Sequence, residues 1–282
     1  MKITSNWFFA VMLICNASFA ETVRTPALSD DNGKYAFEML KMALNYSSTS
    51  YNVVAGTDTS KTFARVIDDL NSNNIDVIWT TSDKDRENEF LPIRIPLYKG
   101  MFGYRILIIK KGSQAKFDTV NSFEDLKKIS LGQGRFWADT KVLEENGLRV
   151  VKVTKYPSLF YMVDGDRIDA FPRAIHEPFD EINSRKNLDL AVETSILLVY
   201  KIPFYFFVAK RNTALAEKIE AGLNKAIADG SFDNHFYSNE GVQKAMASSN
   251  LKNRKVFNLT NSNLPPETPL DRKELWLDIS KF

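Results

Sequence analysis

The sequence predicts an α/β protein of two lobes joined by two hinge strands. Short apolar runs alternate with segments of helical periodicity, a pattern typical of parallel sheets covered by helices. The alternation passes through two similar cycles, and two extended apolar segments, residues 105–110 and 204–209, separate them. We therefore expect a discontinuous lobe 1, made of residues 21–108 and 204–282. Lobe 2, residues 109–203, is inserted between its parts, and a ligand cleft is expected where the strand ends of the two lobes face each other.

The first cycle predicts three strands and two helices. A first helix covers residues 35–45, and a second begins after Thr59 or Ser60, either of which could cap it. This second helix has an apolar inner face of Phe63, Val66, Ile67 and Leu70. The strands of this parallel βαβαβ unit are residues 22–27, 51–55 and 75–79.

The second cycle begins after residues 110–112 with a helix that Ser122 caps. Its strands are predicted at residues 129–131, 150–153 and 168–171, and its helices at 122–126, 138–145, 159–164 and 176–184. A strand at 204–209 then leads into a long helix at 213–229. The polar, proline-rich segment 261–269 is expected to wrap the surface.

The N-terminus has the layout of a secretory signal peptide. Lys2 is followed by nine apolar residues, 7–15, and then by Ser18-Phe19-Ala20, which ends on a small residue. As a helix, nine residues would span only about 14 Å, roughly half of a bilayer core, which disfavours the alternative of a membrane anchor. A lipid anchor on Cys15 is disfavoured because two bulky residues precede it. We expect residues 1–20 to be a signal peptide and the protein to be periplasmic.

Composition excludes several classes of function. Cleavage after Ala20 removes Cys15, the only cysteine, so the mature chain has neither a disulfide nor thiolate chemistry. The formal net charge falls only from +2 to +1, which predicts no strong attraction to nucleic acid or to an anionic membrane. His176 and His235 lack partners at metal-ligand spacing. We therefore expect no metal, no cofactor and no nucleic-acid partner, and a monomer.

Four motifs, in order, resemble those of the periplasmic solute-binding proteins of the amino-acid-binding type (family 3-like). NIDVIWTT at 74–81, Arg86 and PLY at 96–98 are similar to that family's first-lobe pattern x-D-x-x-x-x-x-T-x-x-R followed by P-Y. GDRIDAF at 165–171 is similar to its G-x-x-D-A strand, and FVAK at 207–210 with IADG at 227–230 is similar to its return to lobe 1. The resemblance covers roughly residues 22–240. It implies the type 2 periplasmic-binding-protein fold, a clamp that closes on a small solute.

Arg86 is the first candidate for a ligand contact. A guanidinium can bind a carboxylate through two charge-assisted hydrogen bonds, and the matching arginine of the family binds the carboxylate of the ligand. Alternatively, Arg86 is a solvated member of the charged run 83–89. Trp79 and Thr80, at the carboxyl end of the preceding strand, would form the cleft wall, although Trp79 could equally belong to the core.

The run GQGRFWADT at 132–140 is the candidate contact of lobe 2. Glycines let the backbone approach a ligand, and the start of the following helix favours an anion. The family has a G-x-x-x-G-T/S turn here, whereas Gly134 is followed by three bulky residues. We expect Gly134 and Trp137 to contact the ligand, with packing between sheet and helix as the alternative for Trp137.

The strand ending at Phe171 departs most from the family pattern. Amino-acid binders have an aspartate just after it that holds the ammonium of the ligand, but here Arg173 and Ala174 follow, and the first carboxylate is Glu177. Arg173 in the cleft would favour a dicarboxylate, whereas Glu177 in the cleft could still bind an amine. A surface ion pair is the alternative for Arg173.

Three functions follow from this sequence. The first is a non-catalytic receptor that binds an amino acid or a dicarboxylate-like solute for a membrane permease or a sensor protein. The second is a dehydratase-like enzyme on the same fold, with His176 or Glu177 as the acid–base group. The third is an accessory protein that binds envelope components.

Overall fold

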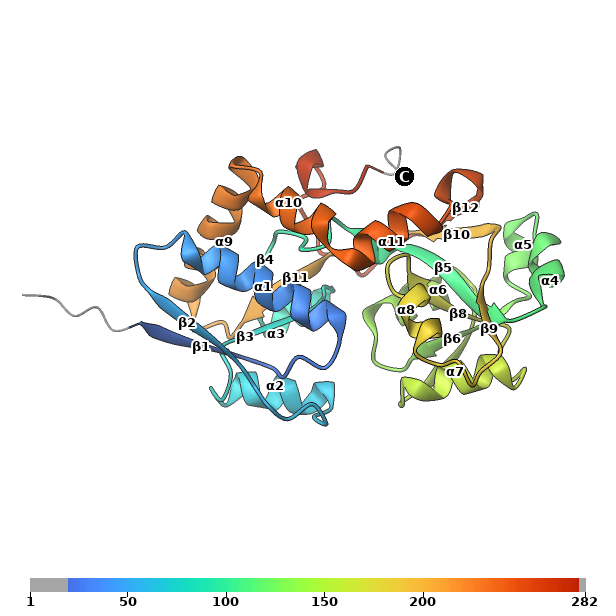
Figure 1. Cartoon of the computed structure of the whole chain (residues 1–282), viewed down its shortest axis with the longest axis horizontal. Coiled ribbons are helices and arrows are strands. Elements are labelled where there is room, and N and C mark those ends of the chain that lie inside the picture. The colour runs from blue at the N-terminus through green and yellow to red at the C-terminus, as the bar shows by residue number, and fades with distance from the viewer. Residues whose placement is uncertain (1–19, 279–282) are drawn as a thin grey trace, which may run out of the picture.

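The computed structural model describes residues 20–278, and the predicted signal peptide therefore lies outside the described residues except for Ala20. Figure 1 shows two α/β bodies side by side, with the chain passing between them more than once. Within residues 20–278, no helix has the length and apolar character needed to span a bilayer.

The first body contains two small sheets. β1 (Glu21–Thr25) pairs in parallel with β2 (Tyr51–Ala55), and β11 (Phe204–Val208) lies between β3 (Val77–Thr81) and β4 (Leu91–Ile93), antiparallel to both. We expected β1, β2 and β3 in one parallel sheet, and only the pair β1–β2 is confirmed. The Asp76 carboxylate accepts the Arg24 backbone N–H at 2.8 Å, so a side chain takes a donor that a β1–β3 ladder would use.

Helices of the first body pack through apolar faces. α1 (Asp31–Asn45) lies against α9 (Thr213–Ala228), and α10 (Ser231–Ser238) follows α9. α2 (Phe63–Asn71) is capped by Thr62, whose hydroxyl accepts the Arg65 N–H, so the expected caps Thr59 and Ser60 are wrong. Ser60 instead donates its hydroxyl to Asp58 at 2.6 Å, in a turn before the helix. α3 (Lys84–Glu89) is a short helix capped by Asp83.

The second body is built on a seven-stranded mixed sheet. The strand order is β12-β10-β5-β8-β6-β7, and β9 also pairs with β5. The bounds are β5 (Tyr104–Lys110), β6 (Ser130–Gly134), β7 (Arg149–Val153), β8 (Ala170–Ala174), β9 (Leu190–Val192), β10 (Ile196–Val199) and β12 (Lys255–Asn258). Its helices are α4 (Gln114–Asp118), α5 (Phe123–Leu126), α6 (Ala138–Glu145), α7 (Pro157–Asp164) and α8 (Pro178–Asn183). α11 (Glu240–Ser248) lies near the junction of the two bodies in Figure 1. Ser122 caps α5 in a capping box, as predicted.

The two segments expected to be hinge strands are sheet strands, one in each body. β5 pairs with β8, β9 and β10 in the second body, and β11 is the middle strand of its sheet in the first. The segments that lead into β5 and β11 contact each other at Gly103, which ends a 3-10 turn. There the Tyr200 N–H donates to the Gly103 carbonyl at 3.0 Å. A Cβ on Gly103 would lie 1.9 Å from the Tyr200 carbonyl oxygen, so only glycine allows this crossing.

The C-terminal segment contacts both bodies. β12, which falls within the residues assigned to lobe 1, pairs in parallel with β10 of the second body. The tail beyond it bonds to α6 through Asn146 and Thr260 at 2.7 Å and to α3 through Lys84 and Asn263 at 3.1 Å. The limits of the two lobes stay a prediction.

Candidate functional site

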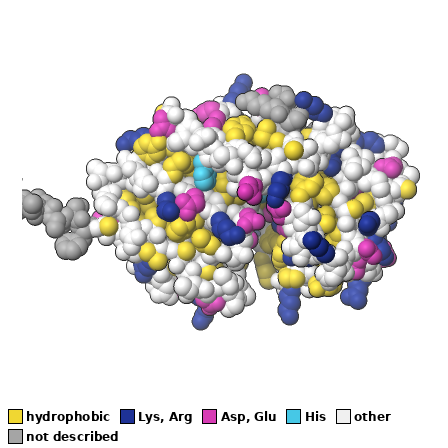
Figure 2. Space-filling view, viewed as in Figure 1, with side chains coloured by type: hydrophobic (Ala, Val, Ile, Leu, Met, Phe, Trp, Pro, Cys, Tyr) yellow, Lys and Arg dark blue, Asp and Glu magenta, His cyan; other side chains and the backbone are white. Residues whose placement is uncertain are grey.

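A cavity of about 1230 Å³ lies between the two bodies. The first body lines it with the segment after β1, the β2–α2 loop, α2, the end of β3 and Arg86. The second body contributes residues 134–138 and the end of β7 with Tyr156. Figure 2 shows the surface hollowed between the two halves of the molecule, with hydrophobic side chains visible inside the notch. The cavity therefore has walls from both bodies, as a clamp requires.

Arg86 projects into this cavity from the first turn of α3. The Asp83 carboxylate caps that turn and accepts the Arg86 backbone N–H at 2.7 Å. The guanidinium carbon lies 4.8 Å from the centre of the Phe63 ring, and Nε is buried without a hydrogen-bond partner. Among the described residues, no carboxylate oxygen lies within 4.0 Å of this guanidinium. Burial lowers the pKa of Arg86, and an anion in the cavity would offset that loss of hydration.

Trp79 and Thr80 line the same cavity from the carboxyl end of β3. The Trp79 ring lies edge-on to Phe206, with ring centres 6.5 Å apart, and packs beside Gly33 in the first turn of α1. Both side chains are half-buried. Trp79 therefore packs at the edge of the core and also lines the cavity. The sequence left these two positions open as alternatives, and the side chain occupies both.

Gly134 and Trp137 line the cavity from the β6–α6 junction of the second body. Trp137 precedes α6 and turns back onto Gly134, where a Cβ would lie 2.5 Å from the indole ring. The indole also stacks on Phe171, with ring centres 6.1 Å apart and planes 22° apart. Gly134 is therefore needed for the position of Trp137, and Trp137 packs in the second body while it lines the cavity.

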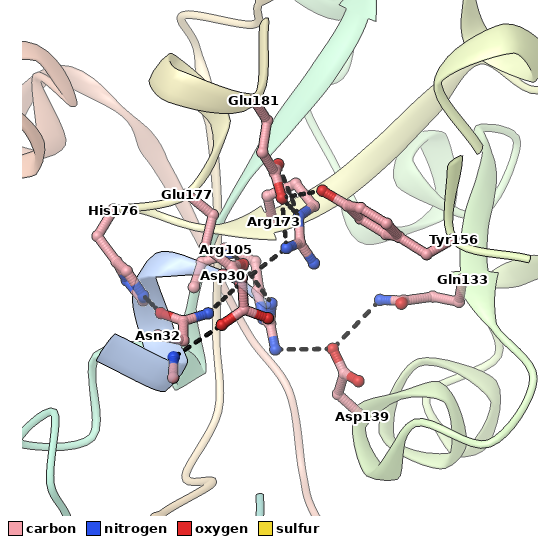
Figure 3. Close-up of polar contacts among 12 residues, drawn as sticks. Asp30, Asn32, Arg105, Gln133, Asp139, Tyr156, Arg173, His176, Glu177 and Glu181 are labelled. Atoms are coloured by element: carbon pink, nitrogen blue, oxygen red, sulfur yellow. Dashed lines mark hydrogen bonds and ion pairs between the residues drawn. The ribbon is translucent and has the colours of Figure 1, made fainter. Parts of the chain in front are cut away.

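Arg173 and Glu177 do not line this cavity; they are bound to each other. Figure 3 shows Arg173 turned toward Glu181 and Tyr156, and its guanidinium lies 2.7 Å from Glu177 and 2.6 Å from Glu181. Burial alone would lower the pKa of Arg173, but the two carboxylates outweigh it and raise that pKa. Arg173 is thus saturated by the protein's own acids, because α8 brings Glu177 and Glu181 over the end of β8. The cavity gives no support to the expectation that a second arginine at 173 binds a dianion.

Glu177 joins the pair to a longer buried network. It accepts the Ala174 N–H at 2.8 Å, and Asn32 of α1 donates to it at 3.2 Å across the two bodies. Arg105 of β5 lies 3.5 Å from Glu177 and 2.8 Å from Asp139. Burial opposes ionisation of Glu177, but Arg173 and its other neighbours outweigh it and lower the pKa. Both oxygens of Glu177 are therefore in contact with groups of the protein itself.

His176, the other candidate acid–base group, is buried beside this network. Its Nε2 lies 3.0 Å from the Asn32 side-chain oxygen, and its ring stacks on Tyr98 with centres 4.7 Å apart. Burial lowers its pKa to about 4. His176 does not itself line the cavity, although its partner Asn32 does.

Phe63 and Phe136 are among the aromatic residues of the cavity that were not predicted from the sequence. Phe63 was assigned to the inner face of α2, but it is the first residue of that helix and lies under Arg86. Phe136 was noted only as a bulky neighbour of Gly134, and it is 77% exposed on the cavity wall. Helical periodicity places Phe63 on the apolar face of α2. It cannot tell whether a residue on that face is buried in the core or lines a cavity.

The residues from 20 to 278 hold no group of three or more histidine, cysteine or acidic side chains placed to bind a metal ion. Asp30 is the remaining acidic side chain of interest in the cavity. It caps α1 by accepting the Gly33 N–H at 2.7 Å, and burial raises its pKa.

No protein-family model and no curated protein sequence matches the chain significantly. Solved structures do match. The probable amino-acid ABC transporter extracellular-binding protein YtmK of Bacillus subtilis aligns with a TM-score of 0.60 and 18% identity, over 80% of this chain and 100% of that one. A Salmonella typhimurium periplasmic binding protein with high arginine specificity aligns with a TM-score of 0.56 and 16% identity, over 77% and 97%. The ancestral amino-acid-binding protein AncCDT-1, a precursor of cyclohexadienyl dehydratase, gives 0.54 and 17%, over 77% and 93%.

The chain has the type 2 periplasmic-binding-protein fold. The two bodies of Figure 1 account for its two lobes, and the cavity lies between them as the fold leads one to expect. Sequence identities of 16–18% support a shared fold, but they do not identify the ligand of this chain. Within this fold, Arg86 and Trp79 come from one side of the cavity and the β6–α6 junction from the other.

Proposed function

We propose that this protein is an exported, non-catalytic receptor that clamps a small carboxylate-bearing solute between its two bodies. It would deliver that solute to a membrane permease or report it to a sensor protein. The N-terminal pattern of residues 1–20 supports export, and the similarity to binding proteins of amino-acid transporters supports the receptor role.

The observation that carries the proposal is the state of Arg86. Its guanidinium is partly buried in a cavity between two bodies, lies on an aromatic ring, and has no carboxylate partner among the residues described. Of the other cations of the cavity wall, Arg24 and Lys61 are each paired to an aspartate, at 2.8 and 2.6 Å, whereas Arg135 is exposed to solvent. Partial burial costs the guanidinium some of its hydration, and a ligand carboxylate would supply a direct partner.

Closure would follow from differential affinity. A solute held by Arg86 in the open form gains further contacts at the β6–α6 junction only when the bodies approach, so it shifts the population toward the closed form. Ala138, at the first position of α6, lines the cavity, and the start of that helix favours an anion.

The enzyme hypothesis has less support in this structure. One structural neighbour is a precursor of a dehydratase, which makes the hypothesis worth testing. However, His176 and Glu177, the acid–base groups proposed for it, are buried in the network and do not line the cavity. We therefore do not propose a catalytic step.

The test is ligand binding by residues 21–282. A thermal-shift screen against amino acids, monocarboxylates, dicarboxylates, polyamines and small peptides would find the ligand class, and calorimetry would measure the dissociation constant. A ligand at 100 times this constant stabilises the native state by about 2.7 kcal/mol, which raises the melting temperature by roughly 5 °C or more.

Arg86→Met separates the anion site from the rest of the cavity. Hydrogen bonds to charged groups contribute about 1.5–3 kcal/mol, so we expect the variant to bind at least tenfold more weakly. Arg65→Met is the matched control, because Arg65 lies on the neighbouring helix, is exposed and does not line the cavity. Equal affinities of wild type and Arg86→Met for every ligand found would reject the proposal.

A further inference from the structure

Exposed apolar side chains concentrate in the cavity. Six large hydrophobic residues of the described chain are strongly exposed: Val54, Phe63, Phe136, Tyr161, Val256 and Leu270. The first three of these line the cavity between the bodies. Since large apolar surfaces left in water usually mark a binding site, this cavity is built to cover something apolar as well as an anion.

Phe136 is the most exposed of the six, and the local packing explains why. Trp137, the next residue, is held inward by Gly134 and by stacking on Phe171. Phe136 therefore has no place in the core of the second body, and its ring remains 77% exposed at the cavity. A closing movement that covers this ring would gain hydrophobic free energy that the open form lacks.

The first body supplies a matching apolar wall. Phe63 is 41% exposed at the start of α2, and Val66 and Ile67 of the same helix also line the cavity. Val54 of β2 is 42% exposed and continues this wall. The guanidinium of Arg86 lies 4.8 Å from the Phe63 ring centre, so the anion site and the apolar wall adjoin.

Glu177 and Asp30, two acidic side chains that could hold the ammonium group of a free amino acid, are engaged to different degrees within the protein. Glu177 is bound by Arg173, Arg105 and the Ala174 N–H, and does not line the cavity. Asp30 does line it, but one of its oxygens caps α1. The cavity thus offers Asp30, a partly engaged carboxylate, together with an apolar wall to which both bodies contribute.

We propose that the cavity selects a carboxylate carried on a flat apolar body, an aryl-alkyl carboxylate, and that Phe136 of the second body clamps this body against Phe63. The inference rests on the proposed function, because Arg86 holds the carboxylate. Phe136 is then the residue that determines specificity for the ligand body, while Arg86 determines specificity for the charge.

The test compares two carboxylates that differ only in the aromatic ring. Calorimetry measures binding of 3-phenylpropionate and of propionate to residues 21–282 of the wild type, Phe136→Ala, Tyr161→Ala and Arg86→Met. Tyr161→Ala is the matched control, because Tyr161 is also an exposed aromatic residue but lies outside the cavity. Thermal melts check that Phe136→Ala is folded, which we expect because the side chain is so exposed.

We expect wild type to bind 3-phenylpropionate at least tenfold more tightly than propionate, and Phe136→Ala to lose most of that ratio while Tyr161→Ala retains it. A ratio unchanged by Phe136→Ala, or no preference for the aromatic acid in wild type, would overturn the clamp. If a polar ligand such as glutamine binds more tightly than 3-phenylpropionate and depends on Arg86, the clamp fails and the proposed function stands. If 3-phenylpropionate binds through Phe136 but Arg86→Met is without effect, the anion site fails and the apolar clamp stands.

Discussion

Removal of the Arg105 guanidinium is the perturbation that tests the buried charge network most directly. Arg105 lies in β5 with its side chain 4% exposed, between Asp139 at 2.8 Å and Glu177 at 3.5 Å. Its Nε also donates to the Tyr200 hydroxyl at 3.0 Å. In Arg105→Met, the apolar stem is kept while the charge and its donors are lost.

The two carboxylates would be affected unequally. Glu177 keeps Arg173 at 2.7 Å and the Ala174 N–H. Asp139, 3% exposed, keeps only the Gln133 amide and the Tyr200 hydroxyl, each at 3.2 Å. Because a buried charge is left without its counter-charge, we expect the free energy of unfolding to fall by about 3–5 kcal/mol.

Urea unfolding, followed by circular dichroism, measures this loss. Asp139→Asn should also destabilise the protein, and the double variant should lose less than the sum of the single losses, by about 1 kcal/mol or more. Lys34→Met is the control, because its partner Asp31 is exposed, and we expect no measurable change in its urea midpoint. If Arg105→Met loses less than about 1 kcal/mol, or if the losses simply add, Arg105 is not the counter-charge of Asp139.

Three further predictions concern other sites. The pKa of His176 is about 4 in the folded protein against 6.5 when unfolded, so the unfolded state takes up the proton first and stability falls as pH drops from 6.5 toward 4. Urea midpoints across this range should show a shallower fall in His176→Gln, and an equal slope would refute the assignment. Gly134→Ala places a Cβ 2.5 Å from the Trp137 ring, so we expect a loss of about 1–3 kcal/mol and an altered near-UV dichroism spectrum; an unchanged spectrum would contradict it. Ser122→Ala removes the α5 cap, and thermal melts should show a loss of about 1 kcal/mol, which Ser122→Thr should largely avoid.

The local pattern of the sequence predicted most elements within a few residues. The second β-strand, α6 and the Ser122 cap were found at the predicted positions, because strand alternation, helical periodicity and capping depend on neighbours along the chain. The start of α2 was missed by a few residues, since three hydroxyl residues compete to cap it. The strands β9 and β12 were missed because they are short and gain their stability from partners far away in the chain.

In the candidate site too, some residues were predictable from local sequence and others depended on distant contacts. Five of the seven predicted ligand contacts line the cavity: Arg86, Trp79, Thr80, Gly134 and Trp137. They lie at or after the carboxyl ends of β3 and β6, which open onto the cavity, so position along the chain was informative. Whether any of them binds a ligand stays a prediction. Arg173 and Glu177 also lie near the end of a strand, β8, yet α8 folds over them, and the sequence does not show which acids a buried arginine will meet.

By itself, the sequence determined the alternation of strands and helices, the lack of cysteine after residue 20 and the run of residues that ends in Arg86. These are properties of composition and of short-range order. Only the tertiary structure decided that Arg173 is neutralised within the protein, that Arg86 has no carboxylate partner among residues 20–278, and that Phe63 and Phe136 share one cavity. The physical reason is that ion pairing and burial depend on which distant segments pack together. The environment of a charged group and the exposure of an apolar one are therefore fixed only in the folded chain.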